Sequence, residues 1–184
     1  MRIIVGAMVM TAVVFLAPAA PASQTDKRLN TIFERLSSTD SKAEAAKLTN
    51  LVWAIWHESD NEIVNSFMSK GIEEMSQRNY EDSVASFSKV VELDPNFAEG
   101  WNKRATAYYL MGDLESSIRD VDRTLALEPR HFGALSGLGL IYLAFGEGWE
   151  ALKAFKAALR VNPHLAGPQA HVKELQRNLR GKPI

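Results

Sequence analysis

Three prolines at equal intervals constrain this chain more than any other feature of its sequence. Pro95, Pro129 and Pro163 lie 34 residues apart, and the residues around them repeat with the same period. A period of 34 residues is the length of a helix–turn–helix unit that stacks into a solenoid. One such unit cannot bury its apolar side alone, so consecutive units stack and the stack needs a polar end. Chains of this kind bind partners more often than they catalyse reactions.

Small and large residues recur at fixed positions of three units, which span residues 64–97, 98–131 and 132–165. Position 8 of each unit is small and position 24 is apolar, at Gly71, Ala105 and Gly139 and at Phe87, Val121 and Phe155. Small residues let two helices approach, and large residues fill the space between them. In the turn of the second unit, Gly112 is predicted to end one helix and Asp113 to cap the next, and Asn79 to cap in the first unit.

This pattern resembles the tetratricopeptide repeat (TPR) family. Residues 98–113, which read AEGWNKRATAYYLMGD, are similar to the first helix and turn of that repeat. The third unit matches best, through Leu138, Gly139, Tyr142, Gly146, Ala151, Phe155, Ala158 and Pro163. The first unit departs from the family pattern at Glu74 and Arg78. The resemblance implies an all-α TPR solenoid of three repeats, and a function in protein or peptide binding.

Two further segments flank the three units. Residues 166–184 are predicted to form a capping helix and tail, with an apolar stripe that includes Ala170 and a polar face that includes His171. Residues 23–63 are predicted to form two helices, a degenerate leading pair out of phase with the repeats; Ser41 and Glu44 have the capping-box spacing. Trp53 in this pair has two interpretations, burial against the next helix or an anchor for a partner.

Residues 1–22 have the pattern of a secretory signal peptide. Arg2 supplies a positive charge, residues 3–17 are an apolar run, and Ala20 and Ala22 satisfy the small-residue rule for cleavage before Ser23. The alternative is a membrane anchor, but the run is shorter than the roughly 20 residues that span a bilayer. We therefore expect an exported, periplasmic protein with no stable membrane span after cleavage. The chain has no cysteine, which excludes disulfides and thiolate metal sites.

The sequence carries no arrangement of side chains that suits catalysis. No pair of its four histidines has the i, i+4 spacing of a helical metal site, and Gly-x-Ser-x-Gly, P-loop and dinucleotide motifs are missing. We therefore expect no enzyme activity, no cofactor and no metal. The net charge of −1 disfavours nucleic acid as a partner, because such proteins need a clearly basic surface.

The family resemblance also places a binding surface on the concave face of the solenoid. The groove residues that it implies are Met68, Ile72, Met75, Asn102, Thr106, Tyr109, Ser136, Leu140 and Leu143. Glu99, at position 2 of the second unit, belongs to the same face. Some TPR domains clamp the acidic carboxyl terminus of heat-shock chaperones, but the clamp positions here hold Met68, Ile72, Lys103, Gly133 and Gly137, which do not match. A rival surface is the basic carboxyl end, with Lys173 and Arg177.

These observations predict a periplasmic protein–protein interaction adaptor. The chain resembles small exported TPR proteins of Gram-negative bacteria that are associated with cell-envelope integrity. One alternative is a chaperone-like module that binds unfolded or helical client segments, as in cytochrome c maturation. Another is an accessory subunit of an envelope enzyme complex. The sequence does not identify the protein or peptide partner.

Overall fold

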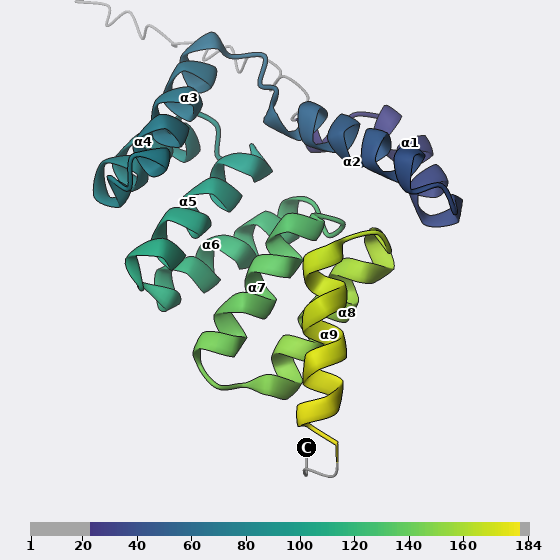
Figure 1. Cartoon of the computed structure of the whole chain (residues 1–184). Helices are drawn as coiled ribbons and strands as arrows, with labels where there is room; N and C mark the ends of the chain where they lie inside the picture. The colour runs from purple at the N-terminus through teal and green to yellow at the C-terminus, as the bar shows by residue number, and fades with distance from the viewer. Residues whose placement is uncertain (1–22, 181–184) are drawn as a thin grey trace, which may run out of the picture.

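The computed structural model describes residues 23–180, and every regular element in that range is helical (Figure 1). A short 3-10 turn, η1 (Ser23–Thr25), precedes the α-helices. Their bounds are α1 (Arg28–Ser38), α2 (Lys42–His57), α3 (Glu62–Ser76), α4 (Tyr80–Leu93), α5 (Ala98–Met111), α6 (Leu114–Leu127), α7 (Phe132–Ala144), α8 (Gly148–Val161) and α9 (Ala166–Asn178). The predicted all-α class is confirmed. The predicted signal peptide, residues 1–22, lies outside the described residues.

Three helix pairs form the solenoid. The pairs α3–α4, α5–α6 and α7–α8 each pack together, each pair packs on the next, and α9 packs on α8 (Figure 1). Helices α5 and α7 begin at Ala98 and Phe132, the first residues of the predicted second and third units. Helix α3 begins at Glu62, slightly before the first unit was predicted to start. The 34-residue period therefore corresponds to one helix pair.

Close contacts inside each pair explain the small residues at position 8. A Cβ atom on Gly71 would lie 2.6 Å from the ring of Phe87, and one on Gly139 would lie 2.6 Å from the ring of Phe155. Both rings are buried in the core. The Ser83 hydroxyl, at position 20, donates a 2.9 Å hydrogen bond to the carbonyl oxygen of Gly71. Small residues at positions 8 and 20 therefore bring the two helices of a repeat together.

The turns inside the three repeats share one backbone conformation. Gly112 and Gly146 have positive φ angles of 83° and 79°, as expected for a left-handed helix end. Arg78 holds the equivalent position in the first repeat and has a φ of 65°. The departure of the first unit from the family pattern therefore changes the residue and leaves the turn intact. A side chain at such a φ strains the backbone, because Cβ approaches the carbonyl oxygen.

Two of the three predicted helix caps are present. The Asp113 carboxylate accepts a 3.0 Å hydrogen bond from the Ser116 amide, and the Ser41 hydroxyl accepts one of 3.3 Å from the Glu44 amide. The prediction for Asn79 is wrong, because its side chain makes no capping hydrogen bond. Its amide instead donates to the side chain of Gln77 at 3.5 Å.

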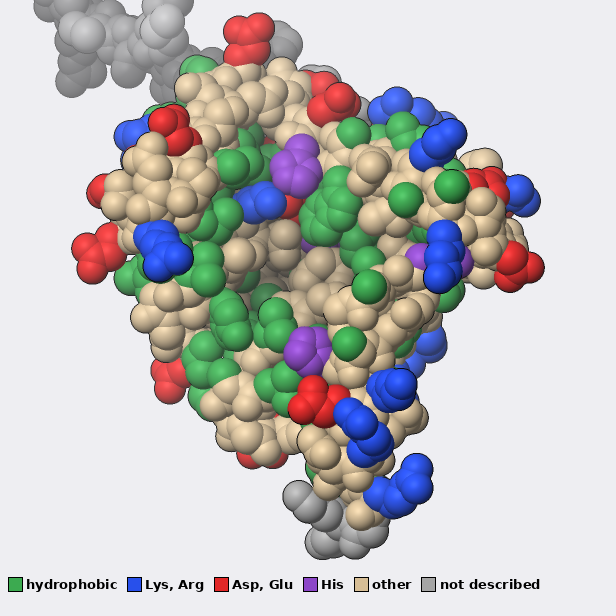
Figure 2. All heavy atoms as spheres, in the orientation of Figure 1, with side chains coloured by type: hydrophobic (Ala, Val, Ile, Leu, Met, Phe, Trp, Pro, Cys, Tyr) green, Lys and Arg blue, Asp and Glu red, His purple; other side chains and the backbone are tan. Residues whose placement is uncertain are grey.

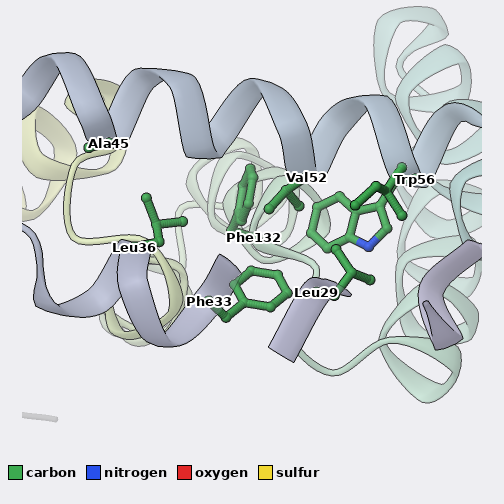
Figure 3. Close-up of a cluster of buried hydrophobic side chains, with 8 residues drawn as sticks. Leu29, Phe33, Leu36, Ala45, Val52, Trp56 and Phe132 are labelled. Carbon is green, nitrogen blue, oxygen red and sulfur yellow. The ribbon is translucent and has the colours of Figure 1, made fainter. Parts of the chain in front are cut away.

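The leading helix pair folds back along the solenoid. Leu29, Phe33, Val52 and Trp56 from α1 and α2 form one buried cluster with Phe132, the first residue of α7 (Figure 3). Further polar contacts tie the pair down, since the Asn162 amide donates to the Thr49 hydroxyl at 3.0 Å and Gln24 bonds to the turn before α5. Trp56 is thus buried against the third repeat and not against α3, the next helix in the sequence.

Positions 3, 7 and 10 of each repeat, which face the preceding helix, explain why α2 does not stack on α3. In repeats 2 and 3 and in α9 these positions mostly hold small or apolar residues. Those in contact with the preceding helix are Gly100, Arg104, Ala107, Ala134, Leu138, Ile141, Val172 and Leu175. In the first repeat they hold Ser66, Lys70 and Glu73, which are all exposed. This face of α3 is therefore polar where α2 would have to stack, and α3 serves as an end of the solenoid.

Helix α9 provides the other end, as predicted. Val172, Leu175 and Leu179 pack against the core of the third repeat. Two details of the prediction are wrong. Ala170 is exposed, so it does not belong to the apolar stripe. The ring of His171 stacks on Phe155, with ring centroids 4.7 Å apart, so it does not lie on the polar face.

Candidate binding groove between the second and third repeats

A cavity of about 220 Å³ opens between α5 and α7. Five of the predicted groove residues line it, namely Asn102, Thr106, Tyr109, Ser136 and Leu140. Its remaining lining comes from Ala105, Ser117, Val121, Gly133, Gly137 and Ile141. Figure 2 shows this face of the molecule hollowed near its centre, with hydrophobic side chains along the border. The helix positions that the repeat pattern assigned to the groove thus converge on one site in the two central repeats.

The other four predicted groove residues do not line this cavity. Met68 is buried in the core of the first repeat, with only 3% of its surface exposed, so it offers nothing to a partner. Met75 is half-buried against the same core, and Leu143 packs against the core under α9. Ile72 is exposed on α3. The cavity is therefore shorter than the groove that the family resemblance implied.

Helix α2 closes one end of the cavity. A Cβ atom on Gly133, which lines the cavity, would lie 2.5 Å from the ring of Trp53. Trp53 is half-buried and meets Phe132 edge-on, with ring centroids 5.2 Å apart. Of the two interpretations of Trp53, the structure supports packing, although onto the third repeat and not onto α3. Its half-exposed ring nevertheless borders the groove.

The fully buried carboxylate of Glu99 holds α2 at the end of the cavity. Glu99 Oε2 lies 2.9 Å from His131 Nε2, and Glu99 Oε1 lies 3.2 Å from both His57 Nε2 and Lys103 Nζ. The contacts join α5, the turn before α7 and the last residue of α2. The ring of His131 is in turn stacked on Trp56, with centroids 4.1 Å apart. Glu99 therefore ties the leading pair to both central repeats.

Hydrogen-bond geometry assigns the tautomer of the neutral His131 ring. Its Nδ1 accepts a 3.0 Å hydrogen bond from the Ala134 amide, so the proton of the neutral ring is on Nε2 and is donated to Glu99. Burial by itself raises the pKa of Glu99. The hydrogen bond from His131 and the nearby charge of Lys103 outweigh burial, and the pKa of Glu99 lies below its usual value. The carboxylate is thus ionised and sealed, which suits a structural role.

Sequence reasoning placed Glu99 on the open groove and did not foresee this cluster. The repeat position predicts the correct face of α5, but helix α2 covers its first turn. The signal was the grouping of Trp53, Trp56 and His57 at helical spacing on α2, which marks one face with large aromatic groups. The rival basic surface also exists, since Lys173 and Arg177 are both exposed on α9.

Other chemistry is sparse in the part of the chain that the structure describes. Within it, no group of three or more His, Cys, Asp or Glu side chains is placed to hold a metal ion. The Arg104 guanidinium donates two hydrogen bonds, of 2.7 and 2.9 Å, to the Asp120 carboxylate and so links α5 to α6. The cavity itself offers hydroxyl and amide groups on an apolar background, an arrangement suited to binding.

Comparisons with known proteins agree with the repeat assignment. A family model described as TPR repeat matches residues 71–112, and one described as tetratricopeptide repeat matches residues 103–166. A TPR repeat-containing protein of Rhizobium etli is 29% identical over 160 residues, which cover 87% of this chain and 78% of the relative. The small glutamine-rich tetratricopeptide repeat-containing protein 2 of Mycosarcoma maydis is 28% identical over 95 residues, which cover 52% of this chain and 27% of the relative.

Solved structures share the fold of the repeats. The first TPR domain of Spaghetti (RPAP3), bound to the HSP90 peptide SRMEEVD, superposes with a TM-score of 0.63 at 20% identity, over 66% of this chain and 97% of that one. The crystal structure of MamA superposes with a TM-score of 0.59 at 23% identity, over 62% of this chain and 67% of that one. At such identities the likeness extends to the fold alone.

Proposed function

We propose that this chain is a non-enzymatic adaptor that holds a segment of a protein partner in the cavity between α5 and α7. Its residues 71–166 belong to the tetratricopeptide-repeat family. The observation that carries the proposal is the convergence of Asn102, Thr106, Tyr109, Ser136 and Leu140 on one cavity. They occupy the groove positions of two consecutive repeats, so a bound segment would cross both helices.

Exposed apolar residues at the ends of α5 and α7 favour an apolar or helical segment. Leu110 and Met111 at the end of α5 are 43% and 42% exposed, and Phe145 at the end of α7 is 47% exposed. Met111 and Phe145 hold the same repeat position, in the last turn of α5 and directly after α7. Exposed apolar residues of this kind suit the apolar face of an amphipathic helix.

An acidic carboxyl-terminal peptide is a poorer candidate. The solved relative RPAP3 binds such a peptide, but the corresponding clamp positions of this chain hold Met68, Ile72, Lys103, Gly133 and Gly137. Of these side chains only Lys103 is basic, and it is already paired with Glu99. The proposed partner is therefore recognised through apolar contacts and hydrogen bonds.

The place of action that we propose is the periplasm, where the adaptor supports the cell envelope. The pattern of residues 1–22 supports export, with cleavage before Ser23. Gln24, the second residue after the proposed cleavage, is buried and hydrogen-bonded to Asn96 and Ala98. Within residues 23–180, no helix combines the length and hydrophobicity that crossing a membrane requires. Amino-terminal sequencing of the periplasmic protein tests the proposed cleavage.

A second candidate is a chaperone-like module that receives unfolded or helical client segments. The exposed Leu110, Met111 and Phe145 favour it, because exposed apolar side chains, the flexible methionine among them, can contact different apolar sequences. The two candidates differ in the complexes they form. An adaptor retains one partner at constant stoichiometry, whereas a client-binding module captures many apolar segments briefly.

A cavity-filling variant tests the groove. A Cβ atom on Gly137 meets no neighbour within 4 Å, so Gly137→Leu places its side chain in the cavity without disturbing the core. We expect this variant to lose the partner in cross-linked pull-downs from periplasm, by at least tenfold. The matched control is Ala126→Leu, which adds a leucine at an exposed position of α6.

Two outcomes would refute the proposed groove. One is unchanged capture by Gly137→Leu with a native circular dichroism spectrum. The other is loss of capture on charge reversal of Lys173 and Arg177 alone, which would place the binding surface on α9.

A further inference from the structure

The hydrogen bonds around the cavity leave it rich in acceptors. The Thr106 hydroxyl donates to the carbonyl oxygen of Asn102 at 2.9 Å, and the Ser136 hydroxyl donates to that of Phe132 at 2.6 Å. The Ser117 hydroxyl likewise donates to Ala105 at 2.7 Å. Each hydroxyl has a single proton, so these side chains retain only lone pairs for a ligand.

Asn102 adds a fourth acceptor. Its side-chain nitrogen lies 2.9 Å from Glu99 Oε2, and a carboxylate can only accept, so the amide NH2 group faces Glu99. This contact settles which end of the amide is the oxygen. Asn102 Oδ1 accepts no hydrogen bond from the residues that the structure describes, although 92% of the residue is buried. It is also not sealed from solvent in the way that Glu99 Oε1 is, which places it at the cavity surface.

The supply of donors is correspondingly small. Among the polar side chains that line the cavity, the Tyr109 hydroxyl proton and one of the two Asn102 amide protons are left outside the hydrogen bonds of the described residues, since Thr106, Ser117 and Ser136 use their protons within the protein. A buried acceptor without a donor is costly, so the cavity discriminates between ligands by the donor they carry. The preferred ligand has an N–H group on an otherwise apolar body.

The size and shape of the cavity favour one flat ring system. A cavity of about 150 Å³ lined by apolar side chains admits benzene, and this one, at about 220 Å³, is larger. Gly137 lines the cavity and a Cβ atom on it would meet nothing within 4 Å, so a ring could lie against α7 there, whereas the ring of Trp53 already covers Gly133 one turn earlier.

We propose that the cavity receives a tryptophan side chain of the protein partner, with the indole ring against Gly137 and the indole N–H donated to Asn102 Oδ1. Indole combines an apolar two-ring body with a single donor and no acceptor, which complements the lining. This inference rests on the proposed groove function and adds to it the side chain that the groove selects.

Three small probes test the inference without altering the protein. N-acetyl-tryptophanamide, its 1-methylindole analogue and N-acetyl-phenylalaninamide are titrated into the purified protein, and backbone amide shifts of Thr106, Ser136 and Gly137 are followed by NMR. We expect the tryptophan amide to shift these signals and to bind at least tenfold more tightly than the methylated analogue, which lacks the donor. Equal binding of these two probes would overturn the assignment of the N–H group.

Variants then localise the effect. Asn102→Leu is expected to remove the preference for the unmethylated probe, and Gly137→Leu to abolish binding, whereas Ala126→Leu leaves both unchanged. Circular dichroism of each variant reports whether it is folded. Retention of the preference by folded Asn102→Leu would exclude Asn102 as the acceptor.

Two further results separate this inference from its premise. If no probe binds but partner capture still depends on Gly137, the indole inference fails and the groove function stands. Tighter binding of free tryptophan than of the blocked amide would indicate a metabolite as the ligand, because only free tryptophan carries charged backbone groups, and it would overturn the assignment to a protein partner.

Discussion

Two glycines on helix α7, two residues apart, are expected to respond to alanine in opposite directions. Gly139 faces α8, where a new Cβ atom would lie 2.6 Å from Cε1 and 2.7 Å from Cδ1 and Cζ of Phe155. Gly137 faces the cavity, where a new Cβ atom meets nothing within 4 Å. The two substitutions change the helix propensity of α7 equally, so their difference isolates the packing against Phe155.

The magnitudes follow from this geometry. Replacing a helical glycine by alanine stabilises a helix by roughly 0.5–1 kcal/mol, and Gly137→Ala should gain that amount. Gly139→Ala gains it as well but must displace the ring of Phe155, which is only 1% exposed and held between α7 and α9. Overpacking of a tight core typically costs about 1–3 kcal/mol. We therefore expect Gly139→Ala to be less stable than Gly137→Ala by that amount.

Urea denaturation followed by circular dichroism measures both variants against the unsubstituted protein. In a domain of this size, 1 kcal/mol corresponds to roughly 2–4 °C in Tm, so thermal melting provides an independent reading. Because repeat proteins unfold through nearest-neighbour interactions, hydrogen exchange in α7 and α8 should localise the loss. Gly71→Ala repeats the experiment in the first repeat, where the ring of Phe87 is equally close. Equal midpoints for Gly137→Ala and Gly139→Ala would refute the reasoning.

Two further variants test the turn of the first repeat and the buried carboxylate. Arg78→Gly should stabilise the protein by about 0.5–1 kcal/mol, since Arg78 has a φ of 65° where Gly112 and Gly146 relieve the strain; slower amide exchange in α3 and α4 would show it, and faster exchange would contradict it. Glu99→Gln should destabilise the docking of α1 and α2 by about 2 kcal/mol at neutral pH, as loss of hydrogen bonds to a charged group implies. Because the pKa of Glu99 is lowered by folding, the carboxylate's contribution is complete above its unfolded pKa of about 4.3 and disappears as the pH falls through the lower folded value. Tryptophan fluorescence during acid titration should thus show the two proteins converging only below about pH 4, and convergence near neutral pH would exclude this role.

Much of the solenoid was predictable because its determinants are local and repeated. The prolines, the small residues at position 8 and the turn glycines recur in phase, and each acts within one helix pair. The groove was predictable in part. Asn102, Thr106, Tyr109, Ser136 and Leu140 line the cavity, whereas Met68 is buried, because the core of the first repeat takes a large side chain from this position.

The leading pair was misjudged because its partner is distant in the sequence. A signal did exist in the exposed polar residues Ser66, Lys70 and Glu73, which occupy the positions that pack on a preceding helix in the later repeats. Comparing those positions across repeats predicts that α3 ends the solenoid. The same comparison does not say where α1 and α2 go instead, since many apolar surfaces could accept them.

The sequence by itself determined the class of fold, the length of the repeat, the helix ends and the face of each helix that can meet a partner. These follow from spacing, because helical periodicity and turn geometry act over a few residues. Only the tertiary structure decided that α2 closes one end of the groove, that Glu99 is sealed beneath it and that Asn102 presents an oxygen to the cavity. Those features depend on contacts between residues far apart in the chain, such as Thr49 with Asn162 and Glu99 with His131, whose pairing no local pattern specifies.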